Sequence, residues 1–121
     1  MTACLAAGAM VLHLTAGIFS LHWTHSVERV AWEEDWSVSD STLRLDQFRI
    51  KGSGAGMEPG ADAVWRDGWW VSPGHLQVAS LRLSASGATQ GGWTLCADGA
   101  CHTLGAQTGQ PITVAPCGLA R

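Results

Sequence analysis

The chain has 121 residues, enough for one domain with a single core, and its seven basic residues are scattered along it. The net charge of -3 and the lack of a basic stripe argue against nucleic-acid binding, which needs clustered Lys and Arg. Hydrophobic residues make up 46% and charged residues only 14%, with 15 glycines. This composition predicts one small, turn-rich β domain over residues 1–121.

The first segment, residues 3–21, is nearly uncharged, so a signal peptide, a membrane helix and a pair of strands are all alternatives. No Lys or Arg precedes Arg29, and the positively charged start of a signal peptide is therefore missing. Gly8, His13 and Gly17 interrupt the apolar run, which makes it a poor membrane span. We favour a hairpin, with a strand on either side of a turn at residues 15–17.

Strand patterns recur along the whole chain, and no helical periodicity extends beyond two turns. Turn dipeptides such as Asp67-Gly68 and Asp98-Gly99 separate the strands. The expected fold class is all-β, an antiparallel β-sandwich or flattened barrel of about 8–11 short strands. The expected strands are residues 3–7, 11–14, 18–27, 32–38, 42–50, 63–65, 69–71, 76–84, 92–96, 101–104 and 112–117.

Residues 23–36 read W-T-H-S-V-E-R-V-A-W-E-E-D-W and are the most distinctive stretch of the chain. Because strand side chains alternate, the first strand places His25 on its apolar face and the second places Glu34 there, with Glu33 opposite. A hairpin with a four-residue loop, 28–31, keeps both apolar faces on one side of the sheet. That register pairs His25 with Glu34 and Trp23 with Trp36.

A buried carboxylate needs a partner, so this register predicts a raised pKa for His25 and a lowered one for Glu34. The alternative is a structural histidine in the core, whose ring nitrogens are hydrogen-bonded by other groups. Acidic side chains gather nearby, and they would line a site for a cation beside aromatic rings or form a solvated strand edge. We name His25, Ser26, Glu28, Glu33 and Glu34 as candidate binding residues. We expect no bound metal and no cofactor.

A glycine-rich loop, K-G-S-G-A-G-M-E-P-G, occupies residues 51–60. Its backbone amides have the conformational freedom to form an anion-binding concavity, although no strand–loop–helix unit follows as in nucleotide-binding motifs. The alternative is a wide connection packed under Met57. The candidate binding residues of this loop are Ser53, Gly54, Gly56, Met57 and Glu58. Ser53 is also the one serine that we consider as a hydroxyl near His25, because Ser26 points to the opposite face.

The four cysteines match neither a C-x-x-C redox motif nor a paired zinc knuckle, so two disulfides are the simpler interpretation. The segment C-A-D-G-A-C puts Cys96 and Cys101 across a tight hairpin. Cys4 and Cys117 are left to join the terminal strands. Four buried free thiols are the alternative. Disulfides would indicate an oxidising compartment, which in bacteria is the periplasm.

Several of these motifs together resemble the bacterial "domain of unknown function 1850" family. They are W-T-H-S-V-E at 23–28, W-E-E-x-W at 32–36, G-S-G-A-G-M at 52–57 and the closing W-T-L-C, C and P-C pattern at 93–117. Members of this family are small exported or membrane-anchored proteins, often encoded beside TAXI-type tripartite ATP-independent periplasmic (TRAP) transporters. The resemblance implies a periplasmic accessory β domain and supplies no catalytic residues. A basic signal or anchor typical of many members is missing here.

Two functions follow as expectations. The first is a non-enzymatic accessory domain that binds a TRAP membrane subunit, its TAXI solute-binding protein or the small-molecule solute. The second is a small metal-dependent or hydrolytic enzyme that uses His25, Glu34 and Glu58. We favour the first, because the chain offers no complete set of nucleophile, base and oxyanion donors.

Overall fold

A computed structural model describes residues 3–24, 30–51, 62–85 and 92–117. Within these ranges the chain forms twelve strands and no helix, which confirms the all-β class. The strands are β1 (Ala3–Ala7), β2 (Met10–Leu14), β3 (Ile18–Thr24), β4 (Ala31–Val38), β5 (Leu43–Lys51), β6 (Val64–Arg66), β7 (Trp69–Pro73), β8 (Gln77–Val78), β9 (Leu81–Leu83), β10 (Trp93–Ala97), β11 (Ala100–Leu104) and β12 (Ile112–Pro116).

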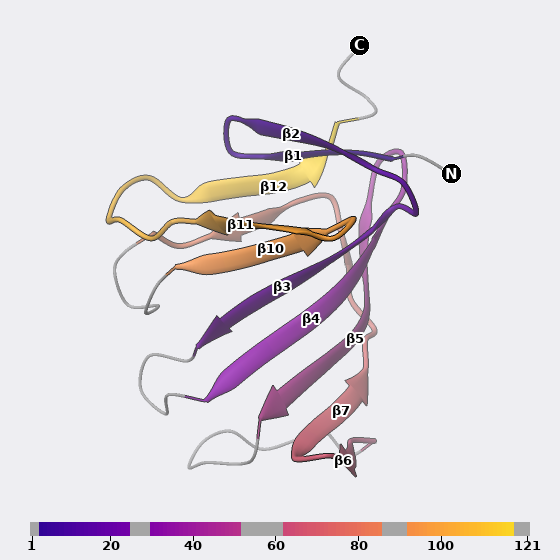
Figure 1. Ribbon diagram of the computed structural model, residues 1–121. Coiled ribbons are helices and arrows are strands. Elements are labelled where there is room, and N and C mark those ends of the chain that lie inside the picture. Colours follow the sequence, from indigo (N-terminus) through magenta and orange to yellow (C-terminus); the bar gives the residue numbers. More distant parts are fainter. Residues whose placement is uncertain (1–2, 25–29, 52–61, 86–91, 118–121) are drawn as a thin grey trace.

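The strands form two antiparallel sheets that do not close into a barrel, so the sandwich is the form observed. The small sheet has the order β2-β1-β12-β9. The large sheet has the order β11-β10-β3-β4-β5-β7-β6, with β8 paired to β5. In Figure 1 the small sheet lies over one end of the large sheet, and β3, β4 and β5 extend away from it towards β7 and β6. Part of the large sheet therefore lies beyond the small one.

The core lies between the two sheets and is built from alternate residues of their facing sides. Leu5 and Val114 from the small sheet and Leu21 and Trp36 from the large sheet are at most 1% exposed. Trp36 is the largest of them. Because each strand turns one face to this core, its other face is left for polar side chains.

The predicted hairpin of residues 11–14 with the strand from residue 18 is wrong in its pairing. Strand β2 pairs with β1 in the small sheet, whereas β3 pairs with β4 and β10 in the large sheet. Residues 15–17 carry the chain from one sheet to the other, and Gly17 there has a φ of 68°. Leu14 and Phe19 on either side are both buried in the core, so burial between sheets prevailed over local pairing.

The predicted strand over residues 76–84 divides into two short strands that belong to different sheets. Strand β8 pairs with β5, and β9 pairs with β12. The alternating pattern of this segment is compatible with both neighbours. Contacts with residues distant in the sequence decide which sheet each part joins. The local alternation of the segment carries no information about those contacts.

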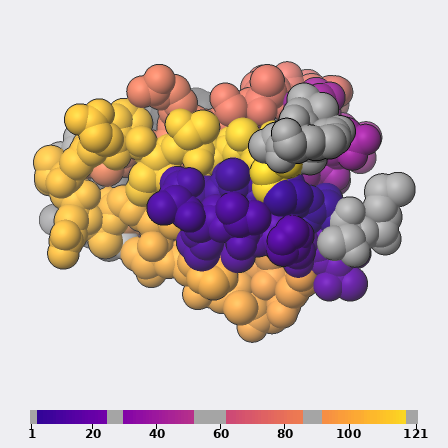
Figure 2. All heavy atoms as spheres, turned by 90° about the horizontal axis from the view of Figure 1, so that it is seen from above, coloured from indigo at the N-terminus to yellow at the C-terminus, as the bar shows by residue number. Residues whose placement is uncertain are grey.

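The two predicted disulfides are present, between Cys4 and Cys117 and between Cys96 and Cys101. Cys96 and Cys101 lie directly opposite each other in the β10–β11 hairpin, at a Cα–Cα distance of 4.1 Å. The first disulfide joins the two ends of the described chain, where β1 pairs with β12. Figure 2 shows the N-terminal strands packed against C-terminal residues. The described residues contain no helix able to cross a membrane.

Candidate functional site

Strands β3 and β4 pair in a different register from the predicted one. Leu21 lies opposite Glu34, Trp23 opposite Trp32 and Phe19 opposite Trp36. The predicted pairing of Glu34 with His25 and of Trp23 with Trp36 is therefore wrong. The slip is an even number of residues, so the assignment of side chains to faces is correct. In the observed register Trp23 stacks on Trp32, with ring centroids 5.6 Å apart.

Glu34 lies on the inner face of β4 and has Trp36 as its hydrogen-bond partner. The indole Nε1 of Trp36 donates to Glu34 Oε1 at 2.9 Å. Burial raises the pKa of Glu34, and the hydrogen bond from Trp36 opposes the rise only in part. The predicted lowering of this pKa is wrong, because the carboxyl group faces Leu21 and Phe48 on the neighbouring strands rather than a cation.

The outer face of the same strands carries a connected chain of polar side chains. Ser20 Oγ lies 2.8 Å from His22 Nε2, two residues along β3. His22 Nδ1 lies 3.2 Å from Glu33 Oε2 on β4. Glu33 can only accept at that position when ionised, which favours the tautomer with the proton on Nδ1 and leaves Nε2 to accept from Ser20. A hydroxyl, an imidazole and a carboxylate are thus linked in series.

Arg49 on β5 holds the acidic side of this chain in place. Its Nε donates to Glu33 Oε1 at 2.7 Å, and its Nη1 donates to Asp35 Oδ2 at 2.9 Å. The hydrogen bond to Asp35, followed by that to Glu33, raises the pKa of Arg49 against the opposing effect of burial. Arg49 is 22% exposed, so the guanidinium is shielded enough for these charge-assisted bonds to position Glu33.

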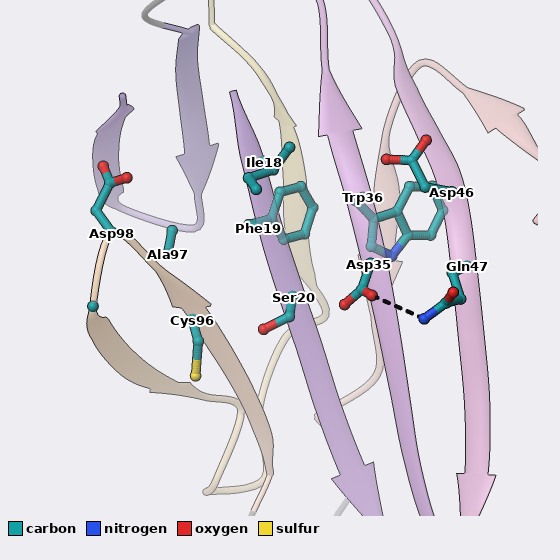
Figure 3. Close-up of a pocket in the computed structure, with 11 residues that line it drawn as sticks. Ile18, Phe19, Ser20, Asp35, Trp36, Asp46, Gln47, Cys96, Ala97 and Asp98 are labelled. Carbon is teal, nitrogen blue, oxygen red and sulfur yellow. Dashed lines mark hydrogen bonds between the residues drawn. The ribbon is translucent and has the colours of Figure 1, made fainter. Parts of the chain in front are cut away.

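An open pocket of about 630 Å³ lies beside Ser20 on this outer face. Figure 3 shows Ser20 and Asp35 on adjacent strands, Gln47 bonded to Asp35, and Cys96 on the other side of Ser20. Two further carboxylates, Asp46 and Asp98, complete the acidic lining. Ion pairs hold Asp35 to Arg49 and Asp46 to Arg44, whereas Asp98 accepts from the backbone and hydroxyl of Thr15. The pocket thus offers negative charge next to a hydroxyl group.

A row of tryptophans crosses the inner face of the large sheet. Trp23 contacts Trp93 on one side, with ring centroids 4.8 Å apart, and Trp32 on the other. The row continues from Trp32 through Ile50 and Trp70 to Trp65, because these residues are register partners. Trp65, on the edge strand β6, is 52% exposed. We call these six residues the tryptophan row.

Two members of the tryptophan row carry a polar atom that has no partner within the described part of the chain. The indole Nε1 atoms of Trp32 and Trp70 are buried and have no acceptor among the residues that the structure describes. Buried N–H groups in proteins are nearly always hydrogen-bonded, because an unpaired one costs about 1–3 kcal/mol. By contrast, Trp36 and Trp93 donate to Glu34 and to the carbonyl of Ser84.

The family model described as "Domain of unknown function (DUF1850)" matches residues 19–104. The chain belongs to this family. The matched region of the DUF1850 domain runs from β3 to β11 and so includes nearly the whole large sheet, while β1, β2 and β12 lie outside it. No curated protein and no solved structure matches the chain.

Most of the candidate binding residues in this DUF1850 chain lie outside the described ranges. These are His25, Ser26 and Glu28, with Ser53, Gly54, Gly56, Met57 and Glu58 of the glycine-rich loop. Of the remaining two, Glu33 belongs to the outer polar chain and Glu34 to the inner face. The structure therefore separates these two neighbours onto opposite sides of the sheet. Within the described ranges, no three His, Cys, Asp or Glu residues group as metal ligands.

Sequence reasoning missed Ser20, His22 and Arg49 as members of a site. The signal was available in part, since a serine and a histidine two residues apart on a strand must share a face. The contribution of Arg49 was not predictable, because it depends on the β4–β5 register across a bulge beside Asp35.

Proposed function

We propose that this DUF1850 domain is an accessory binding domain of the periplasm that acts with a TAXI-type TRAP transporter. The two disulfides support an oxidising compartment. The resemblance to the DUF1850 family supports an association of the domain with this transporter. Its binding partner would be the membrane subunit, the solute-binding protein or the transported solute.

The tryptophan row is the observation that carries this proposal. Large aromatic side chains dominate the energetics of interfaces, and tryptophan is enriched among the residues that contribute most. Here the row leads from the domain interior to an exposed ring at Trp65, next to Val64, which is 53% exposed.

The enzyme alternative built on His25, Glu34 and Glu58 gains no specific support. Glu34, the one described residue of the three, has an indole N–H as its hydrogen-bond partner and lies among apolar side chains. The enzyme alternative therefore stays a prediction.

Affinity purification tests the proposal directly. The tagged domain would be expressed from its own operon and recovered from mildly solubilised membranes, followed by mass spectrometry. We expect TRAP subunits or the solute-binding protein to co-purify, and Trp65→Ala to reduce the yield at least several-fold. Val11→Ala, an exposed apolar residue on β2 of the other sheet, serves as the matched control. Equal recovery with both variants, or no transporter component at all, would reject the proposal.

A further inference from the structure

The outer face of the large sheet carries the elements of a serine nucleophile. Ser20 Oγ, His22 and Glu33 are joined in series at 2.8 and 3.2 Å, with the two imidazole nitrogens facing the hydroxyl and the carboxylate in turn. This is the order of roles that activates a serine in acyl transfer: a hydroxyl, a base beside it, and a carboxylate that orients the base. The same arrangement recurs on unrelated folds, so it is recognised by geometry.

We propose that Ser20 is a nucleophile that takes the acyl group of a carboxylic ester, with His22 as its general base and Glu33 as the residue that orients His22. This activity is separate from partner binding by the tryptophan row, which lies on the opposite face of the sheet. It also differs from the enzyme alternative based on His25, since neither His25 nor Glu34 takes part.

The covalent step balances with an ester and water as the reactants. Ser20 Oγ attacks the ester carbonyl carbon while its proton passes to His22 Nε2. The carbon–oxygen bond to the alcohol then breaks, and His22 returns the proton to the departing alcohol. Water attacks the acyl-serine in the second half, gives its proton through His22 to Ser20, and releases the carboxylic acid.

The neighbours of Ser20 indicate which acyl group fits. The pocket beside the hydroxyl is lined by Asp35, Asp46 and Asp98, and only the first two have a described ion-pair partner. A cationic acyl group would pair with Asp98, whereas an anionic one would be repelled. The substrate class is therefore an ester whose acyl part carries a positive charge.

The rate is expected to be low, because strand β3 is paired on both sides. Its backbone amides take part in ladders with β4 and β10 and do not form an oxyanion hole. Among the residues that line the pocket, Gln47 carries an amide side chain, and it donates weakly to Asp35 at 3.5 Å. A covalent label is therefore a more sensitive readout than turnover.

The first test is labelling of the whole protein by a fluorophosphonate, whose phosphorus is attacked by Ser20 with loss of fluoride. We expect one adduct, mapped to Ser20 by peptide mass spectrometry. Ser20→Ala should abolish it, and His22→Gln should slow it on the order of 100-fold or more, the contribution typical of a general base. Circular dichroism would confirm that both variants are folded.

Two matched variants serve as controls. Ser37→Ala removes another outward-facing serine of the same sheet, bonded to Asp46 but to no imidazole. His75→Gln removes a histidine that faces a carboxylate, Asp62, and that has no hydrogen bond to a serine among the described residues. Both should label as the unmodified chain does. An adduct elsewhere, or equal labelling of the His22→Gln variant, would overturn the proposal.

The second test compares acyl transfer from p-nitrophenyl esters of trimethylammoniobutyrate, acetate and glutarate. We expect the acyl adduct on Ser20 to form fastest with the cationic ester and slowest with the anionic one. Asp98→Asn should reduce the preference for the cationic ester. Equal rates for all three esters would overturn the assigned substrate class, and absence of any Ser20 adduct would overturn the nucleophile.

Discussion

At the scale of single residues, Glu34 is the clearest case in which environment decides chemistry. Its neighbour Glu33 faces His22 and Arg49 on the outer surface, whereas Glu34 faces apolar residues and one indole N–H. Two adjacent carboxyl groups of one strand thus meet opposite environments because strand side chains alternate. Glu33 is held by Arg49 and His22, whereas burial disfavours the ionised form of Glu34.

This difference predicts how stability depends on pH. Because burial raises the pKa of Glu34 above its unfolded value, the folded state binds the proton more tightly. The free energy of unfolding therefore falls as pH rises from the unfolded pKa to the folded one, and stays lower above it. Glu34→Gln keeps an oxygen to accept from Trp36 and removes the titration. We expect this variant to gain stability relative to the unmodified chain as pH increases.

Urea unfolding at a series of pH values measures that gain. Glu33→Gln is the matched control, and it should lose stability because Arg49 and His22 then lose their charged partner. A difference between Glu34→Gln and the unmodified chain that does not change with pH would contradict the assigned burial of Glu34.

At the scale of elements, the strands themselves were largely predictable and their partners were not. Alternation and turn dipeptides locate β4, β7 and β10 within a residue or two at each end, because these signals are local. The hairpin assigned to β2 and β3 failed because a glycine turn serves equally well to pass between sheets. The burial of Leu14 and Phe19, on either side of that turn, determined that β2 and β3 belong to different sheets.

The candidate site shows the same limit at the level of register. The faces of β3 and β4 followed from the pattern, so Glu33 and Glu34 were correctly separated. The predicted pairing was four residues from the observed one, because the requirement for an even loop length fixes the faces of the two strands but not their register. The stacking of Trp23 on Trp32 and the contact of Trp23 with Trp93 are tertiary effects. They determine which residues meet, and the sequence pattern does not contain them.

At the scale of the whole molecule, the two disulfides differ in what they hold together. Cys4 and Cys117 are separated by 113 residues and fasten β1 to the end of β12, whereas Cys96 and Cys101 are separated by 5 and close one hairpin. Chain entropy in the unfolded state then assigns about 5 kcal/mol to the first and about 2 kcal/mol to the second.

We expect replacement of Cys4 and Cys117 together by Ala to lower the free energy of unfolding more than replacement of Cys96 and Cys101. Chemical denaturation of the two double variants, monitored by tryptophan fluorescence, gives the comparison. A larger loss in the Cys96 and Cys101 variant would show that the terminal strands contribute less to the fold than their pairing indicates.

The large sheet of the whole domain presents two different faces, and the binding role is assigned to the inner one. Nuclear magnetic resonance of the indole N–H groups tests this most directly, during titration with the purified solute-binding protein and then with the membrane subunits. We predict that the indole signal of Trp65, the exposed member of the row, moves on binding, while those of Trp36 and Trp93, already bonded to Glu34 and Ser84, stay in place. An unchanged Trp65 signal at saturating concentrations of both partners would contradict the assigned binding face.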